Sequence, residues 1–176
     1  GYSGGAILPT YDAVFQYNET HKNNPMPLIV PANEQGAGFM ASGYARSTGK
    51  PGIVLVTSGP GATNTVTPVR DAMADSIPMI VICGQVNRSS IGSDAFQEAP
   101  ITSVMGSVAK HVFLVTKEEK LAATLRAAFE ISTSGRPGPV VVDVPKDIQT
   151  ASIEFEINST LNIHAYRERL KTIENN

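Results

Sequence analysis

One carboxylate and one glycine-rich loop in the first third of the sequence carry the side chains best suited to chemistry. Glu34 follows the apolar run 27–30 and opens an amphipathic run. The loop Thr57–Asn64, Thr-Ser-Gly-Pro-Gly-Ala-Thr-Asn, follows the apolar run 53–56 in the same way. A strand, a turn and a helix in this order are typical of open α/β sheets, which bind ligands at the carboxyl ends of their strands. We therefore expect Glu34 and the 57–64 loop to face one crevice.

Two interpretations of Glu34 are open from its surroundings. A carboxylate in the first turn of a helix is stabilised by the helix dipole, so Glu34 could be an ordinary helix-start charge. The small residues that follow it, Gly36, Ala37 and Gly38, favour a second interpretation. Glycine is a poor helix former, and small side chains let a flat ligand or another surface approach closely.

The 57–64 loop has a similar ambiguity. Gly59-Pro60-Gly61 could be a plain turn, or it could bring backbone groups against a ligand, with Thr57, Ser58, Thr63 and Asn64 supplying hydrogen bonds. No lysine follows the glycines, so the loop is not a phosphate loop of the Walker type. It also lacks the GxGxxG spacing, so nicotinamide binding has little support.

The elements that must position these residues follow from the apolar pattern. Helical spacing predicts helices over 7–17, 34–48, 62–75, 100–108 and 118–133. Short apolar runs predict strands over 27–32, 53–57, 78–83, 111–115 and 139–144. Because strands alternate with helices, the fold class is α/β, with a doubly wound, mostly parallel sheet that carries helices on both faces. After residue 145 the pattern decays into a polar tail.

Composition narrows the function classes. A chain of 176 residues with 41% hydrophobic and 17% charged residues is typical of one globular domain. Its net charge of −2, without a basic block, argues against a nucleic-acid partner, and no stretch is apolar enough to span a membrane. Cys83 lies in an apolar run and is expected to be an inert buried thiol. The three histidines share no ligand spacing, so a metal site is not expected.

A set of motifs, in a fixed order, identifies the chain by resemblance. They are Gly-Tyr-x-Gly-Gly-Ala (1–6), Glu-Gln-Gly-Ala (34–37), Gly-Tyr-Ala-Arg (43–46), the 57–64 loop, Gly-Gln-Val (84–86), Asp-Ala-Phe-Gln-Glu (94–98) and Gly-Arg-Pro-Gly-Pro-Val (135–140). Together they resemble the pyrimidine-binding domain of thiamine-diphosphate enzymes. The 94–98 motif, with Val-Pro-Lys-Asp at 144–147, is similar to the large catalytic subunit of the acetolactate synthase family.

The resemblance covers residues 1 to about 150 and implies a domain organisation. Residues 1–150 are expected to be a pyrimidine-binding domain without the strand and helix that precede the glycine-rich turn in the family. Residues 151–176 are expected to be a linker toward a central domain. Ser3, Asn33 and Asn87 depart from the commonest family pattern, which has proline, histidine and proline at these positions.

The resemblance also implies roles for individual residues. Glu34 matches the glutamate that hydrogen-bonds N1′ of the cofactor's aminopyrimidine and favours its imino tautomer. Positions matching cofactor contacts are Tyr2, Gly4, Gly5, Thr57, Pro60, Asn64, Gln97 and Arg136. Ala6 and Phe96 match positions near the substrate, and no metal ligand is expected. Phe96 could instead be ordinary core, and Arg136, which lies near the flavin in the family, could simply fix a turn.

The implied activity is the decarboxylation of pyruvate and its condensation with a second 2-keto acid, in branched-chain amino-acid biosynthesis. Thiamine diphosphate is the implied cofactor, with Mg²⁺ and FAD bound mainly by other domains of the family. The implied partners are further copies of the full-length chain, as a homodimer or homotetramer, and a regulatory small subunit. The implied location is the bacterial cytoplasm, or a plastid or mitochondrion in a eukaryote.

Two alternatives and one open question remain beside this interpretation. Another thiamine-dependent carboligase or oxidase would share most motifs, although the glyoxylate carboligases lack the glutamate at the position of Glu34. A non-catalytic domain that binds a partner chain and no cofactor is the alternative from a different class. The open question concerns one face of helix 34–48, formed by Gly36, Phe39, Met40 and Gly43. We expect this face to meet another chain, the alternative being that it packs under the domain's own sheet.

Overall fold

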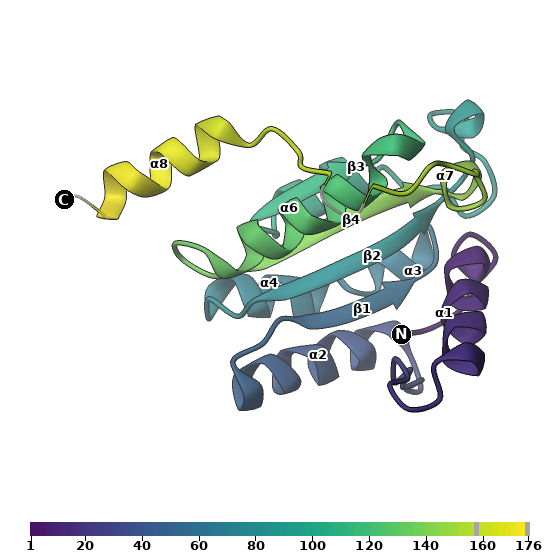
Figure 1. The fold of residues 1–176 in the computed structure, drawn as a ribbon, viewed down its shortest axis with the longest axis horizontal. Coiled ribbons are helices and arrows are strands. Elements are labelled where there is room, and N and C mark those ends of the chain that lie inside the picture. The colour runs from purple at the N-terminus through teal and green to yellow at the C-terminus, as the bar shows by residue number, and fades with distance from the viewer. Residues whose placement is uncertain (157–158, 175–176) are drawn as a thin grey trace.

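The computed structural model describes residues 1–156 and 159–174, which build a four-stranded sheet with helices on both faces (Figure 1). The strands are β1 (Gly52–Val56), β2 (Met79–Gln85), β3 (His111–Leu114) and β4 (Pro139–Pro145). They are all parallel and follow the order β1-β2-β4-β3. The α-helices are α1 (Leu8–Thr20), α2 (Glu34–Thr48), α3 (Pro60–Thr63), α4 (Val66–Ala74), α5 (Ile101–Gly106), α6 (Leu121–Thr133), α7 (Lys146–Gln149) and α8 (His164–Glu174). Two short 3-10 helices, η1 (Arg88–Ser90) and η2 (Glu118–Lys120), complete the set.

Two apolar cores lie on opposite faces of the sheet. On one face, alternate residues of β1 and β2, such as Val54 and Val81, pack against α2, α4 and α5. On the other face, Ile80, Val140 and Val142 pack against α6 and α7. Both central strands are buried along nearly their whole length, which requires the continuous valine and isoleucine runs seen in the sequence. The expected α/β class with a parallel sheet and two covered faces is confirmed.

Helix α2 forms as predicted, and its two ends explain why. The Asn33 side chain accepts a hydrogen bond from the Gly36 amide at 2.7 Å, which satisfies one of the free N–H groups of the first turn. Gly49 ends the helix in the left-handed region at φ 71°, where glycine carries no steric penalty. The cap also shows what the unusual Asn33 does in this chain. It starts the helix at Glu34 and so fixes the position of that carboxylate.

The prediction of a strand over 27–32 is wrong. This segment is extended, but it belongs to no strand of the described chain, and Leu28, Ile29 and Val30 are exposed. Its backbone contact is a hydrogen bond that the Gly1 amine donates to the Ile29 carbonyl at 2.8 Å. Because a strand forms only when a neighbour pairs with its backbone groups, the apolar run alone could not produce one.

The sequence predicts a single helix over 62–75, but the structure has two helices, α3 and α4, in its place. Pro68 has no N–H group, so the Asn64 carbonyl four residues earlier cannot receive a helical hydrogen bond. The buried Thr65 hydroxyl instead donates to the Ala62 carbonyl at 2.7 Å. Asn64 lies at this break, where its side chain reaches Glu34.

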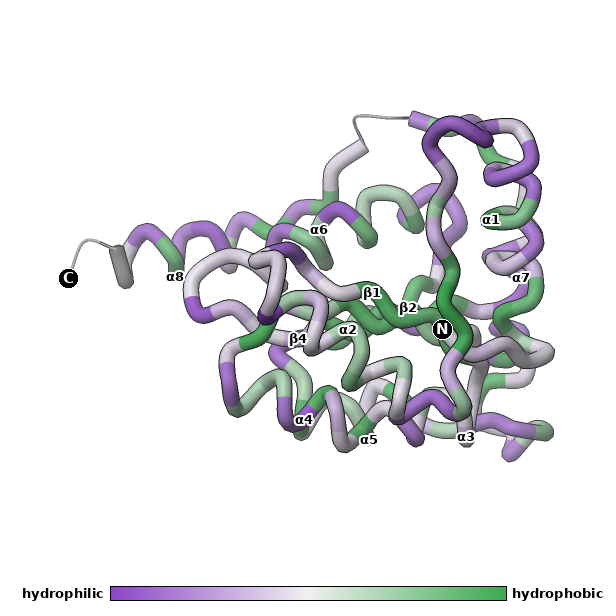
Figure 2. Tube along the Cα trace, turned by 90° about the horizontal axis from the view of Figure 1, so that it is seen from below, coloured by the Kyte–Doolittle hydropathy of each residue, from purple (hydrophilic) through white to green (hydrophobic). Residues whose placement is uncertain are grey.

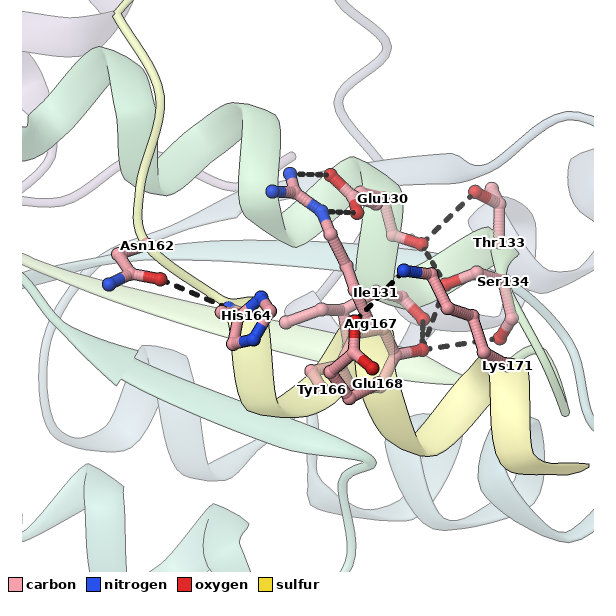
Figure 3. A network of polar contacts seen from close by, with 10 residues as sticks. All are labelled: Glu130, Ile131, Thr133, Ser134, Asn162, His164, Tyr166, Arg167, Glu168 and Lys171. Atoms are coloured by element: carbon pink, nitrogen blue, oxygen red, sulfur yellow. Dashed lines mark hydrogen bonds and ion pairs between the residues drawn. The ribbon is translucent and has the colours of Figure 1, made fainter.

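Helices α7 and α8 fall in the tail for which no helix was predicted. Figure 2 shows that α8 is mostly hydrophilic, so it lacks an apolar periodicity strong enough to identify it. Polar contacts to α6 fix its position (Figure 3). Arg167 forms a bidentate ion pair with Glu130, in which Nε donates to Oε1 at 2.7 Å and Nη2 donates to Oε2 at 2.8 Å. The Tyr166 hydroxyl lies 2.8 Å from the Ser134 hydroxyl.

Helix α1 crosses the carboxyl ends of β1 and β2, next to α7 (Figure 1). The N-terminal turn, α1 and the loops that follow the strands therefore cover the carboxyl ends of the strands. In the described residues, no helix combines the length and the apolar composition that crossing a lipid bilayer requires.

Candidate active site

Glu34 and Asn64 meet at the carboxyl edge of the sheet. Glu34 is the first residue of α2 and is only 9% exposed. The Asn64 Nδ2 group donates a hydrogen bond to Glu34 Oε2 at 3.0 Å, which is the one hydrogen bond to this carboxylate within the described chain. The expectation that Glu34 and the 57–64 loop come together is confirmed by this contact, whereas the crevice that they were expected to share stays a prediction. The Oε1 atom of Glu34 is left to face the loop.

The two glycines of the 57–64 loop are required by close contacts. A Cβ atom on Gly61 would lie 2.6 Å from Thr57 Cγ2 and 3.6 Å from Glu34 Oε1. Gly59 has φ 50°, and a Cβ there would overlap the backbone of Gln97. The loop is therefore built so that backbone, not side chain, lines the space beside the carboxylate. These contacts are made with Thr57 and Gln97 of the protein itself, so they explain the two glycines without a ligand, and the ligand-binding interpretation of the loop stays a prediction.

Thr57 holds the N-terminal turn, residues 1–6, beside the 57–64 loop. The Ala6 amide donates to Thr57 Oγ1 at 3.2 Å, and a Cβ atom on Gly4 would lie 2.5 Å from Thr57 Cγ2. The Tyr2 amide donates to the Leu55 carbonyl at 2.8 Å. Tyr2, Gly4 and Ala6 therefore line up beside the end of β1. Gly5 is exposed, with open space where a Cβ would stand.

Phe96 and Gln97 lie on the irregular segment between η1 and α5. Gln97 and Asp94 both have positive φ, at 58° and 56°, a conformation that non-glycine residues adopt at a cost. The Glu98 carboxylate accepts hydrogen bonds from the amides of Gly92 and Ala95, which closes the loop and lowers the pKa of Glu98. Phe96 is 88% exposed, so the alternative that it belongs to the core is wrong.

Tyr11 is a neighbour of the site that the sequence pattern did not reveal. Its hydroxyl donates to the Leu55 carbonyl at 3.3 Å. Burial, with a smaller contribution from the negative charge of Glu34, raises the pKa of Tyr11 to about 12. The phenol therefore stays neutral beside the carboxylate. Because Tyr11 fits the helical apolar pattern of α1, nothing in the sequence separated it from an ordinary packing residue.

Arg136 is not brought to Glu34. It lies before β4, at the amino edge of the sheet, where Nε donates to Ser76 Oγ at 2.8 Å and Nη2 donates to the Met73 and Ala74 carbonyls at 2.9 and 3.0 Å. These bonds satisfy the carboxyl end of α4, as a turn-fixing arginine would. Arg136 also lines a cavity of about 500 Å³ together with Arg70. Its role at a flavin stays a prediction.

No group of three or more histidine, cysteine, aspartate or glutamate side chains with metal-binding geometry occurs among the residues that the structure describes. Another cavity, of about 520 Å³, lies between the start of α6 and residues 152–156 and 159–160, and neither of these two cavities includes Glu34. The groups that the structure brings together beside Glu34 are its amide partner Asn64 and the close-packed backbone of the 57–64 loop.

Comparison with known proteins agrees with this geometry. Residues 1–107 match the family described as thiamine pyrophosphate enzyme, N-terminal TPP binding domain. The catalytic subunit of mitochondrial acetolactate synthase from Saccharomyces cerevisiae is 56% identical over 157 residues, 89% of this chain and 22% of the yeast protein. The large subunit of acetolactate synthase isozyme 2 from Escherichia coli is 49% identical over 156 residues, which are 89% of this chain and 27% of that protein.

A third relative, the acetolactate synthase large subunit of Corynebacterium glutamicum, is 44% identical over 167 residues, 95% of this chain and 26% of the relative. The chain thus spans about a quarter of the length of the relatives it matches. Since the family match covers more than half of the sequence and contains Glu34, the 57–64 loop and the N-terminal turn, the chain belongs to the thiamine pyrophosphate (thiamine diphosphate) enzymes, through their N-terminal cofactor-binding domain.

Proposed function

We propose that the chain is part of an acetolactate synthase that decarboxylates pyruvate and joins the remaining two-carbon unit to a second 2-keto acid. The single observation that carries the proposal is the pairing of the buried Glu34 carboxylate with Asn64 beside a loop of close-packed backbone. Support for this particular reaction comes from the relatives, whose names all specify acetolactate synthase. The role in branched-chain amino-acid biosynthesis is proposed on the same ground.

The residues at the carboxyl edge fit the pyrimidine ring of thiamine diphosphate. A flat heterocycle packs closely against backbone, and Gly61 places backbone without a side chain beside Glu34 Oε1. Its ring nitrogens need a partner that can share a proton, and a carboxyl group can both donate and accept. When bound, thiamine diphosphate supplies the carbanion chemistry of the reaction.

The protein's own groups would position the cofactor's pyrimidine ring and hold the proton at its N1′ atom. Glu34 would hold the proton at N1′ of the pyrimidine, and Asn64 would keep the carboxylate oriented by donating to Oε2. Thr57 holds the N-terminal turn through the Ala6 amide, so Tyr2, Gly4 and Ala6 would form one wall. Gln97, Phe96 and Pro60 would form the other wall. Gly5 would face the cofactor from the exposed side of the turn.

Other parts of the proposed enzyme lie outside these residues. We propose that Mg²⁺ and FAD are bound mainly by further domains, with residues 1–150 as the pyrimidine-binding domain and 151–176 as the linker that leads toward the central domain. Further copies of the chain, as a homodimer or homotetramer, would complete the site. The phrase "large subunit" in the names of two relatives supports a small-subunit partner. The mitochondrial yeast relative suggests that compartment if the source is a eukaryote.

The test is to assay acetolactate formation by the full-length enzyme and by residues 1–176 alone, each with pyruvate, thiamine diphosphate, FAD and Mg²⁺. The full-length enzyme should form acetolactate, whereas the 176 residues alone should not, since they provide only one side of the proposed site. A full-length protein that binds thiamine diphosphate but forms another product would move the assignment to a different thiamine-dependent carboligase or oxidase.

A further inference from the structure

The Ala6 backbone is held on both of its polar sides, and only one of the holding residues belongs to a recognised motif. Thr57 accepts the Ala6 N–H at 3.2 Å. The Ala6 carbonyl accepts a hydrogen bond from the Gln149 side chain, Nε2, at 2.7 Å. A Cβ atom on Gly84 would overlap this carbonyl, so the turn also lies directly on the backbone at the end of β2.

Gln149 joins three separate segments. Its Nε2 group donates a second hydrogen bond to the Val144 carbonyl at 2.9 Å, at the end of β4. Its Oε1 atom accepts from the Thr10 hydroxyl at 2.9 Å, in the first turn of α1. One half-buried amide at the end of α7 therefore ties the N-terminal turn, α1 and the edge of the sheet together.

The chemistry of the side chain fits this place closely. Two carbonyl oxygens and one hydroxyl group face the amide, and a primary amide offers two N–H donors on one side and one acceptor on the other. A carboxylate of the same shape would place its charge against two carbonyl oxygens, and an apolar side chain would leave them without a donor in a partly buried place.

We propose that Gln149 is a positioning residue, which sets the position of the Gly4–Ala6 turn against Thr57 and thereby shapes the wall of the cofactor site opposite Gln97. The proposal rests on the proposed function for the identity of the ligand. It does not concern the proton shared by Glu34, because Glu34 and Asn64 are held by α2 and the 57–64 loop. Gln149 acts on binding and leaves the chemical step at the carboxylate unchanged.

The experiment compares Gln149→Met and Tyr166→Phe with the wild type in the full-length enzyme. Tyr166 serves as the matched control, because it also makes its hydrogen bonds across segments, to Ser134, but does so at the opposite edge of the sheet. Three quantities are measured: backbone amide exchange in residues 2–12, the thiamine diphosphate concentration that half-saturates binding, and exchange of the cofactor's C2 proton at saturation.

For Gln149→Met, amide exchange in the turn should accelerate, and the half-saturating concentration should rise about tenfold, as expected when one such hydrogen-bonded contact is lost. Exchange of the C2 proton at saturation should stay within about threefold of the wild type, since proton transfer keeps its own partners. Tyr166→Phe should change none of the three. Unchanged half-saturation, or an unchanged turn in the amide exchange, would overturn the proposal.

Gln149→Glu keeps the test decisive if the methionine variant does not fold. A protonated carboxyl group has one O–H donor and can restore one carbonyl contact, so the defect should shrink when the pH is lowered from 8 to about 5.5. A defect that is independent of pH would count against the proposal. If the wild type itself binds no thiamine diphosphate, the proposed function fails, and the amide exchange of residues 2–12 still decides whether Gln149 holds the turn.

Discussion

Asn64 and Glu34 are joined by a hydrogen bond of 3.0 Å between Nδ2 and Oε2, although Glu34 begins α2 and Asn64 directly follows α3. The bond leaves the second oxygen of the carboxylate directed at the Gly61 backbone. One oxygen of the carboxylate is therefore held by Asn64, and the proposed function assigns the other oxygen to the ligand. Each of the first three predictions changes one part of this arrangement.

Glu34→Gln in the full-length enzyme should lower the rate of exchange of the cofactor's C2 proton by about 10²–10⁴, the usual contribution of one general acid–base group. Glutamine has almost the same shape and keeps an oxygen for Asn64, so the fold should persist. Proton exchange followed by NMR measures the effect, and circular dichroism checks the fold. A variant that exchanges at the wild-type rate would remove the role assigned to Glu34.

Asn64→Asp should be more harmful than Asn64→Ala. Alanine removes only the donor that orients Oε2, whereas aspartate places a second carboxylate about 3 Å from the first, and like charges at this distance cannot both ionise easily. The aspartate variant should therefore hold one extra proton near neutral pH and should recover activity as the pH falls. Parallel pH profiles of the two variants check this. Profiles of the same shape would contradict it.

Gly61→Ala should cost roughly 1–3 kcal/mol of stability by overpacking, since the new methyl group would lie 2.6 Å from Thr57 Cγ2. It should also displace Thr57 from the Ala6 amide. Gly43→Ala is the matched control, because Gly43 lies in the middle of α2 with open space around it. That variant should gain about 0.5–1 kcal/mol, as alanine is the better helix former. Urea titration of both variants measures the difference.

Much of the fold was predictable because local rules and tertiary structure agree in it. The buried strands β2 and β4 are continuous apolar runs between glycine and proline signals, and α2 has a capping residue at one end and a glycine at the other. The contact of Glu34 with the 57–64 loop was also expected, although the strand over 27–32 on which that expectation rested does not form, and the start of α2 places Glu34 instead.

The parts that were not predicted depend on partners that lie far away in the sequence. The run 27–32 has strand composition, yet its neighbours in space decide whether it pairs, and in the described chain no strand does so. Tyr11 and Gln149 contact the site or its walls through residues 44 to 143 positions away. Neither residue belongs to a local pattern that could have identified it. Arg136 is a further case, since its partners at the end of α4 were not visible from the Gly-Arg-Pro-Gly turn itself.

The exposed face of α2 should mediate association. Phe39 and Met40 are 43% and 47% exposed, and the buried residues of α2 are on its other side, so the alternative that this face packs under the domain's own sheet is wrong. We expect self-association at roughly micromolar concentration, near the weak end of specific binding. Replacing Phe39 and Met40 by glutamate should abolish it, because a charge in an apolar interface is left without a partner.

Phe129→Glu provides the control for this prediction, since Phe129 is similarly exposed on α6, which covers the other face of the sheet. Sedimentation velocity over a range of concentrations distinguishes the outcomes. Association that weakens equally in both variants would indicate unspecific apolar contact. A wild type that stays monomeric at high concentration would refute the interface.

Because of Asp143, the free energy of unfolding should decrease as the pH is raised from mildly acidic to mildly alkaline values. Asp143 is 1% exposed, and its Oδ2 atom accepts a hydrogen bond from Gln85 Nε2 at 3.0 Å. The buried Cys83 thiol is a further neighbour of the carboxyl group, and Oδ1 has no hydrogen-bond partner in the described chain. Burial raises the pKa of Asp143 from 3.8 to about 7. Between these two values the unfolded chain releases the proton and the folded chain keeps it, so raising the pH favours unfolding.

Asp143→Asn should remove this dependence, because an amide of the same shape keeps an oxygen for Gln85 and never ionises. From pH 5 to pH 8 the wild type should lose roughly 2–3 kcal/mol of unfolding free energy relative to the variant, since each pH unit between 5 and the folded pKa of about 7 corresponds to about 1.4 kcal/mol. Urea titrations of both proteins at the two pH values measure the difference, in which the other titrating groups cancel. If the two proteins keep the same difference at both pH values, the Asp143 carboxyl group does not titrate in this range, and its burial must be offset by a partner beyond Gln85.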